Sequence, residues 1–225
     1  RSFIADNPAL DAGQRNSVLR DGAARLRSVA PAAPAGSSSK DGAASGTKEQ
    51  NFRFFDNRQK YLLFVNTCSE KWVVANRVGL ELANIHPRPP AVRLFDAGVG
   101  DGTVLARVMR TMHARFPTMP FYIAGKEISL EDIRLTLEKL PDRFFEHPAS
   151  VVVLTNLFYT EAPWLRVKSP AAANSLVWKE VALTGNSGHE FEEQITDLQP
   201  FLSENWNARV SEKTGNPVYE RPVVL

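Results

Sequence analysis

Residues 92–103 constrain the fold of this chain more than any other part of its sequence. They begin with a short apolar run, 92–95, which is typical of a buried parallel strand and is followed by Asp96. A helical pattern starts at Val104, and between the two lie three glycines at alternate positions, Gly98, Gly100 and Gly102. Glycines at such a turn allow a tight bend and a close approach of ligand to backbone. The segment therefore predicts a ligand-binding strand, loop and helix.

The spacing of these glycines distinguishes between cofactor classes. A dinucleotide-binding loop reads G-x-G-x-x-G, and when its first two glycines are laid on Gly98 and Gly100, its third falls on Thr103. This mismatch disfavours a nicotinamide-binding oxidoreductase, which remains an alternative. The observed pattern, a strand followed by D-x-G-x-G-x-G, resembles motif I of the class I S-adenosylmethionine (SAM) dependent methyltransferases. In that family the loop runs beneath the methionine and ribose parts of SAM. A glycine-rich turn of another doubly wound protein is the remaining alternative.

A second strand, over residues 121–126, is expected to supply the acidic partner of this loop. In the general fingerprint a carboxylate about 20 residues further on accepts hydrogen bonds from ribose hydroxyls. Here Glu127 lies 25 positions after Gly102 (127 minus 102). A long helix explains the excess, because apolar residues recur at Val104, Val108, Met112 and Phe116. Alone, Glu127 would be read as a solvated carboxylate, but paired with the loop it is interpreted as the ribose ligand.

The order of elements predicts the fold class. Ser129 is expected to cap the next helix with Asp132, and a third strand is expected over residues 150–154. The chain is thus expected to be an α/β protein with a Rossmann-like, doubly wound, mainly parallel sheet and helices on both faces. Two helices are expected ahead of the first strand, the second opened by a capping box at residues 67–70. A fourth strand is expected over 175–183, and a fifth, cut short, over 222–225.

We expect one tail and one domain. Residues 28–47 are rich in Ala, Ser, Gly and Pro and cannot bury enough apolar surface to offset their ordering entropy. Residues 1–50 are therefore interpreted as a flexible, largely disordered tail, and residues 51–225 as the SAM-binding domain. Relative to the seven-strand sheet of the family, this domain would be incomplete at its C-terminus. We expect a second copy, or a further C-terminal segment, to cover the exposed edge.

Composition excludes several classes of function. No apolar run approaches 18 residues, so no membrane span or membrane partner is expected. Seven of the 27 basic and five of the 25 acidic residues lie in residues 1–50, which leaves 20 against 20 and argues against a nucleic-acid partner. Cys68 is the single cysteine, and Cys and His nowhere cluster with metal-ligand spacing. The chain is therefore expected to bind no metal and to be cytoplasmic.

The resemblance to the methyltransferases implies a set of SAM contacts. Those at the ends of the first two strands are Asp96, Ala97, Gly98, Gly100, Asp101, Gly102, Glu127 and Ile128. After the third strand, Asn156 and Leu157 match the position where the family binds the adenine amino group and a ring nitrogen. An asparagine bonded to its own turn is an equally good interpretation of Asn156. Ahead of the first strand, Tyr61 or Lys60 is a candidate contact for the methionine carboxylate, with core packing as the alternative for Tyr61.

The methyl acceptor is expected at the loop over residues 184–189. Ligands of open α/β sheets bind at the carboxyl ends of the strands, and this loop follows the expected fourth strand. His189 is the candidate base for a nucleophile that loses a proton, with Asn186 and Thr184 as orienting groups; the alternative is a loop histidine without a role. The sequence is also loosely similar to small-molecule N-methyltransferases of the histamine type, which favours a small amine as the acceptor. A catalytically silent methyltransferase-like interaction module is the third hypothesis.

Overall fold

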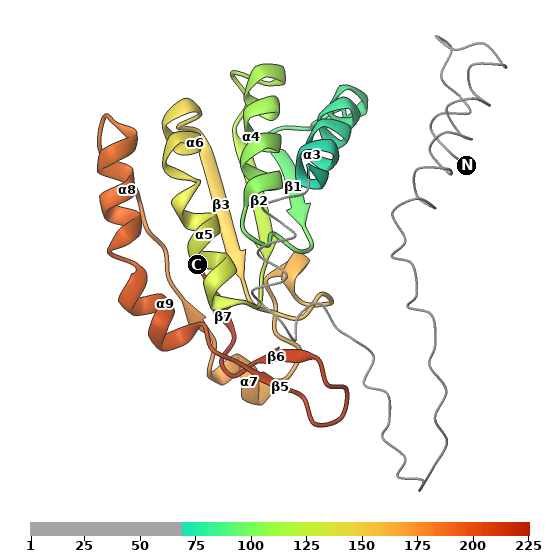
Figure 1. The fold of residues 1–225 in the computed structure, drawn as a ribbon, viewed down its shortest axis with the longest axis vertical. Helices are drawn as coiled ribbons and strands as arrows, with labels where there is room; N and C mark the ends of the chain where they lie inside the picture. The colour runs from blue at the N-terminus through green and yellow to red at the C-terminus, as the bar shows by residue number, and fades with distance from the viewer. Residues whose placement is uncertain (1–68) are drawn as a thin grey trace, which may run out of the picture. The chain divides into compact units, whose positions relative to one another are not determined.

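The computed structural model of the chain describes residues 69–225. The expected tail, its boundary near residue 50, and the candidate residues Tyr61 and Lys60 lie outside the described residues. The first part of the described chain alternates helices and strands (Figure 1). In order these are α3 (Glu70–Glu81), η3 (Leu82–Asn84), β1 (Val92–Asp96), α4 (Thr103–Arg115), β2 (Phe121–Lys126), α5 (Leu130–Glu138), α6 (Pro141–Glu146) and β3 (Ser150–Thr155).

The second part consists of shorter elements. They are η4 (Ala162–Trp164), α7 (Pro170–Asn174), β4 (Val177–Trp178), α8 (Gly188–Thr196), α9 (Gln199–Asn205), β5 (Ala208–Val210), β6 (Pro217–Tyr219) and β7 (Val223–Val224). β5 and β6 form a separate antiparallel hairpin. None of the helices within residues 69–225 has the length and apolar composition of a membrane-spanning helix.

The sheet has five strands in the order β1-β2-β3-β7-β4. β1, β2 and β3 run parallel, β7 pairs antiparallel with β3, and β4 pairs parallel with β7. The predicted α/β class and mainly parallel sheet are confirmed. The prediction of the fourth strand is wrong in length and direction. β4 spans two residues rather than 175–183, and it runs opposite to β1, β2 and β3. The prediction that the fifth strand, over residues 222–225, is an exposed edge is also wrong. β7 lies inside the sheet, between β3 and β4, and both of its valines are buried.

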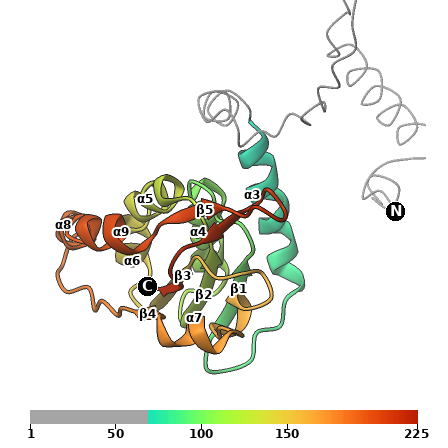
Figure 2. The same ribbon diagram turned by 90° about the horizontal axis from the view of Figure 1, so that it is seen from below.

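The larger core lies on one face of the sheet. Figure 2 shows α4, α5, α6, α8 and α9 gathered on this face, with α7 on the other. Val92, Ile123 and Leu154 project from neighbouring strands into this core, where Leu105 and Met112 of α4 meet them. A smaller cluster that includes Leu157, Ala162 and Val167 lies by η4 and α7. The long helices of the described chain thus cover one face and only short elements cover the other.

Local sequence signals account for the ends of the helices that bear on the site. The Ser129 hydroxyl accepts a hydrogen bond from the Asp132 amide at 3.2 Å, as the predicted cap requires. α4 begins directly after Gly102, whose φ of 77° is strained for any residue with a side chain. α3 begins at Glu70, and Ser69 at its N-cap provides no side-chain cap. The predicted cap, Thr67, lies outside the described residues.

Candidate functional site

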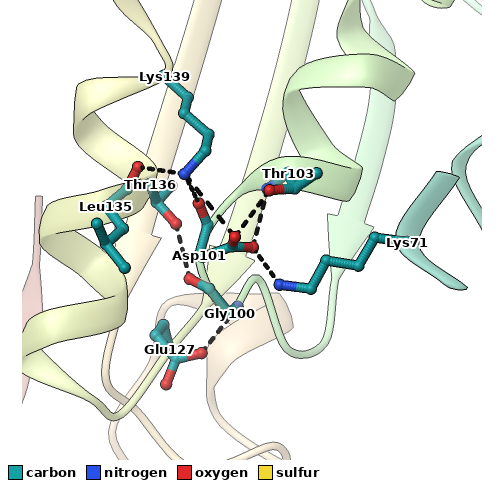
Figure 3. Close-up of polar contacts among 8 residues, drawn as sticks. All are labelled: Lys71, Gly100, Asp101, Thr103, Glu127, Leu135, Thr136 and Lys139. Carbon is teal, nitrogen blue, oxygen red and sulfur yellow. Dashed lines mark hydrogen bonds and ion pairs between the residues drawn. The ribbon is translucent and has the colours of Figure 1, made fainter. Parts of the chain in front are cut away.

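The ends of β1 and β2 meet at the glycine loop. Asp96 and Gly125 are in register, so the loop after β1 lies beside Glu127, which directly follows β2. One carboxylate oxygen of Glu127 accepts a hydrogen bond from the Gly100 amide at 2.9 Å (Figure 3). The other accepts from the amides of Ile128, at 2.7 Å, and Ser129, at 2.8 Å. Glu127 therefore joins the loop of β1 to the N-terminal end of α5.

The glycine loop packs closely against α5. Gly100 has a φ of 58°, and Gly102 one of 77°, both in the left-handed region. A Cβ added to Gly102 would lie 2.8 Å from the backbone Cα of Thr136, and the Thr136 hydroxyl donates to the Gly100 carbonyl at 2.8 Å. Gly98 differs, because a Cβ added there would meet nothing within 4 Å. Gly102 is thus needed for the fold, whereas Gly98 borders open space.

Asp101 closes the N-terminal end of α4. Its carboxylate accepts hydrogen bonds from the Thr103 amide at 3.2 Å and from the Thr103 hydroxyl at 2.7 Å. Lys71 of α3 donates a hydrogen bond to the carboxylate at 2.5 Å, and Lys139, directly after α5, donates to the Asp101 backbone carbonyl at 2.7 Å (Figure 3). Burial raises the pKa of Asp101, but the hydrogen bonds from Lys71 and Thr103 outweigh it and lower that pKa overall. Asp101 is therefore held as a carboxylate between two lysines.

Two further carboxylates, those of Asp96 and Glu127, accept hydrogen bonds from amides of the glycine loop. Asp96 accepts a hydrogen bond from the Gly98 amide at 3.2 Å. Burial raises the pKa of Asp96, and this bond, which lowers the pKa, offsets only part of that effect. Within residues 69–225, neither Asp96 nor Glu127 forms an ion pair with a basic side chain. Exposed Ala97 and half-buried Ile128 complete the predicted contacts at this edge.

Asn156 has a structural role that the sequence left open. Its side-chain oxygen accepts from the Val223 amide, and its side-chain nitrogen donates to the Arg221 carbonyl, both at 2.8 Å. The Leu157 amide donates to the Thr155 hydroxyl at 3.2 Å. Asn156 is thus bonded to backbone, but to that of the C-terminal segment rather than its own turn. An adenine contact through this side chain would compete with both bonds.

The loop over residues 184–189 lies at the opposite edge of the sheet, which corrects its predicted position. β4 runs opposite to β1, so the chain after it leads away from the glycine loop (Figure 1). α8, which begins at this loop, packs against α6. His147 directly follows α6 and bonds the Met119 carbonyl, which precedes β2, so this is the edge where the parallel strands start.

The three predicted catalytic residues make local contacts at that edge. The His189 ring nitrogen lies 3.6 Å from Glu193, with both side chains exposed. The Thr184 amide and hydroxyl both contact the Gln194 side chain, and the Asn186 amide donates to Glu190. None of the three is brought to the glycine loop. Their predicted position assumed that the fourth strand runs parallel to the first three, whereas β4 runs opposite to them.

Three residues of the site were missed by sequence reasoning: Lys71, Thr136 and Lys139. Each meets the loop across 30 or more residues of sequence, and no local pattern marks a lysine as the partner of a distant aspartate. Within the described residues, no group of three or more His, Cys, Asp or Glu side chains could hold a metal ion.

Comparison of the chain with known protein families, curated proteins and solved structures gives no match.

Proposed function

We propose that this chain is a SAM-dependent methyltransferase acting on a small molecule, with an amine as the first acceptor class to test. The observation that carries the proposal is the Glu127 carboxylate bonded to the Gly100 amide beside the open space at Gly98. We further propose that β1, α4, β2, α5 and β3 correspond to the mononucleotide-binding half of a Rossmann-like fold.

The hydrogen bonds at the start of α4 disfavour a dinucleotide. In dinucleotide-binding loops a phosphate lies at the N-terminal end of the helix, where free amides and the helix dipole attract it. Here the first amide of α4, that of Thr103, already donates to the Asp101 carboxylate, which also accepts from the Thr103 hydroxyl, so this amide is not free to bind a phosphate. Asp96 and Glu127 are two further carboxylates of the loop; within residues 69–225 neither is in an ion pair, although Glu127 raises the pKa of neighbouring Lys126 against the effect of burial. SAM, with its sulfonium and ammonium groups, suits this arrangement better than the pyrophosphate of NAD.

Each of three residues around the loop is assigned to one part of SAM. Glu127 would accept one hydrogen bond from a ribose hydroxyl through the oxygen that bonds the Gly100 amide, because its other oxygen already accepts two amides. The backbone at Gly98 would lie beneath the ligand, where a side chain would fill the open space. Asp96 would pair with the ammonium group. SAM supplies an activated methyl group when bound, so the protein has mainly to align the acceptor with it. Residues 184–189 have no part in this proposal.

Calorimetric titration of the full chain with SAM, S-adenosylhomocysteine and NAD tests the proposal. We expect both SAM compounds to bind and NAD to show no binding at the same concentrations. NAD binding without SAM binding would contradict the proposal and favour an oxidoreductase. Binding of SAM without transfer of a labelled methyl group to amine, phenol or carboxylate panels would favour a silent interaction module.

A further inference from the structure

A groove lies on the face of the sheet that points away from the larger core. Val92 of β1 lies in that core, and side chains alternate between the two faces along a strand, so Arg93 and Phe95 point to the other face. The register of β1, β2 and β3 places Tyr122 and Val151 in one row with Arg93. The four residues on this face line a groove of about 960 Å³.

Aromatic and other apolar side chains make up most of the groove. η4 packs on β2, and its Trp164 lines the groove with 78% of its surface exposed. Phe95 and Val151 of the sheet are 38% and 55% exposed. The segments that lead into the three parallel strands also line the groove, at residues 90–91, 120 and 148–149. The groove therefore extends to the edge where these strands start, opposite the edge that carries the glycine loop, and is independent of the proposed function.

The charged side chains at this end of the groove are basic. Arg93 lines the groove and also lines an adjoining hollow, together with His86 and Arg88. No Asp or Glu is among the residues that line either space. Within residues 69–225, none of the three basic side chains is in an ion pair. Their charge is therefore available to attract an anion.

We propose that this groove binds a small planar aromatic carboxylate, with the carboxylate at Arg93 and the rings against Tyr122 and Trp164. A guanidinium group matches a carboxylate through two parallel hydrogen bonds. Aromatic side chains attract a further ring in stacked and edge-to-face arrangements. An apolar concave surface with a few placed polar groups is the usual form of a small-molecule site.

The dimensions of the groove suit a rigid ligand. From Ala91 to Phe95 the chain advances by about 13 Å at about 3.3 Å per residue, and three neighbouring strands span about 10 Å. A ligand of two or three fused rings covers such an area. A flexible acyl chain would lose more rotamer freedom on an open surface of this kind than a planar ring system does. The shape therefore favours an aromatic acid over a fatty acid.

The probe is 2-naphthoate, titrated into the full chain and followed by calorimetry and amide chemical shifts. We expect the largest shifts at Arg93, Phe95 and Tyr122. The 2-naphthylmethylammonium ion has the same rings and the opposite charge, so it should bind more weakly by about tenfold or more. Octanoate keeps the charge but lacks rings, so it should bind more weakly by about fivefold or more. No binding of 2-naphthoate at millimolar concentration, largest shifts outside the groove, or equal or tighter binding of either control would each overturn the proposal.

Variants separate the contact with the carboxylate from the contact with the rings. Arg93→Gln should weaken 2-naphthoate binding by about two- to fivefold, within the range for an exposed ion pair, without weakening the ammonium probe. Arg209→Gln is the matched control, because Arg209 is an exposed arginine of β5 in the separate hairpin, and it should change neither affinity. Trp164→Ala removes a ring but no charge, so it should weaken both aromatic probes by a similar factor.

Equal 2-naphthoate affinities of the two arginine variants would overturn the proposal, since the groove would then bind the rings alone. Circular dichroism establishes that each variant is folded, and the shift experiment on the parent chain needs none of them. Binding to phosphatidylglycerol vesicles by a chain that does not bind 2-naphthoate would also overturn the proposal and would assign this face to a membrane surface.

Discussion

The Glu127 carboxylate accepts a hydrogen bond from the Gly100 amide at 2.9 Å and thereby ties the end of β2 to the loop that follows β1. The two residues are 27 positions apart in sequence, and the parallel pairing of β1 with β2 brings them together. An acidic residue placed here can contact a ligand that rests on the glycine loop. The proposed function depends on this relationship.

Replacing Glu127 by alanine should weaken S-adenosylhomocysteine binding by about 1.5 to 3 kcal/mol, the range for hydrogen bonds to a charged group. That loss corresponds to about ten- to 150-fold in Kd, measured by calorimetry. Glu138→Ala is the matched control, because Glu138 is an exposed acid on α5. Equal affinities of the two variants would mean that Glu127 does not contact the ligand.

Two glycine substitutions should have different consequences. Gly102→Ala should lower the free energy of unfolding by about 2 to 4 kcal/mol, because its φ is 77° and the new Cβ would meet the Thr136 backbone. Gly98→Val should leave stability within about 1 kcal/mol but weaken SAM binding, because its side chain would enter open space. Thermal unfolding and calorimetry measure the two effects. A Gly98 variant that binds SAM normally would place the ligand elsewhere.

The sequence predicted the elements around the glycine loop because their signals are local. The four-residue spacing of apolar side chains marks α4, and Ser129 with Asp132 marks the start of α5. The acid after β2 was found for the same reason. These elements also carry the residues from Asp96 to Ile128 that the resemblance implies as SAM contacts, so periodicity and caps predicted where these residues lie but not what they bind.

The later strands could not be predicted in this way. β4 and β7 are two residues each, too short for a periodic pattern, and β7 takes its place in the sheet through distant contacts. Asn156 makes two of these, to the backbone of Arg221 and Val223. The direction of β4 depends on that docking, so an argument that assumed one more parallel strand put His189 at the wrong edge.

Asn156→Ala should therefore act mainly on stability. It would leave the buried Val223 amide without a partner, at about 1 to 3 kcal/mol, and would also remove the part-buried bond to the Arg221 carbonyl. Urea unfolding measures the loss. Asn207→Ala removes one exposed side-chain bond and should cost under about 1 kcal/mol. If Asn156→Ala instead kept full stability and lost SAM affinity, the adenine role would be supported and the docking role contradicted.

Stability should fall as the solution is acidified below about pH 6.5, the usual pKa of histidine. Buried His147 bonds the Met119 carbonyl through Nε2, so its Nδ1 accepts from His113, at 2.7 Å. Burial lowers the pKa of His147, and His113 lowers it further, against the effect of the Met119 carbonyl. The unfolded chain then binds more protons than the folded chain below that pH. The unfolding free energy should therefore decrease with falling pH, by at most about 1.4 kcal/mol per pH unit from this group.

His147→Phe should flatten this dependence, because a phenyl ring can keep the stacking on Phe121 without titrating. His189→Phe, at an exposed position, should leave it unchanged. Urea unfolding between pH 5 and 8 compares the three proteins. A slope that survives in the His147 variant would assign the acid sensitivity to other groups.

Amide chemical-shift mapping with S-adenosylhomocysteine tests the central claim most directly, because it locates the ligand without relying on turnover. We predict that the ligand shifts the amide signals of Gly98, Gly100 and Ile128 and leaves those of residues 184–189 unchanged. Shifts confined to residues 184–189, or no shifts at a saturating ligand concentration, would contradict the assignment of the glycine loop and Glu127 as a SAM site.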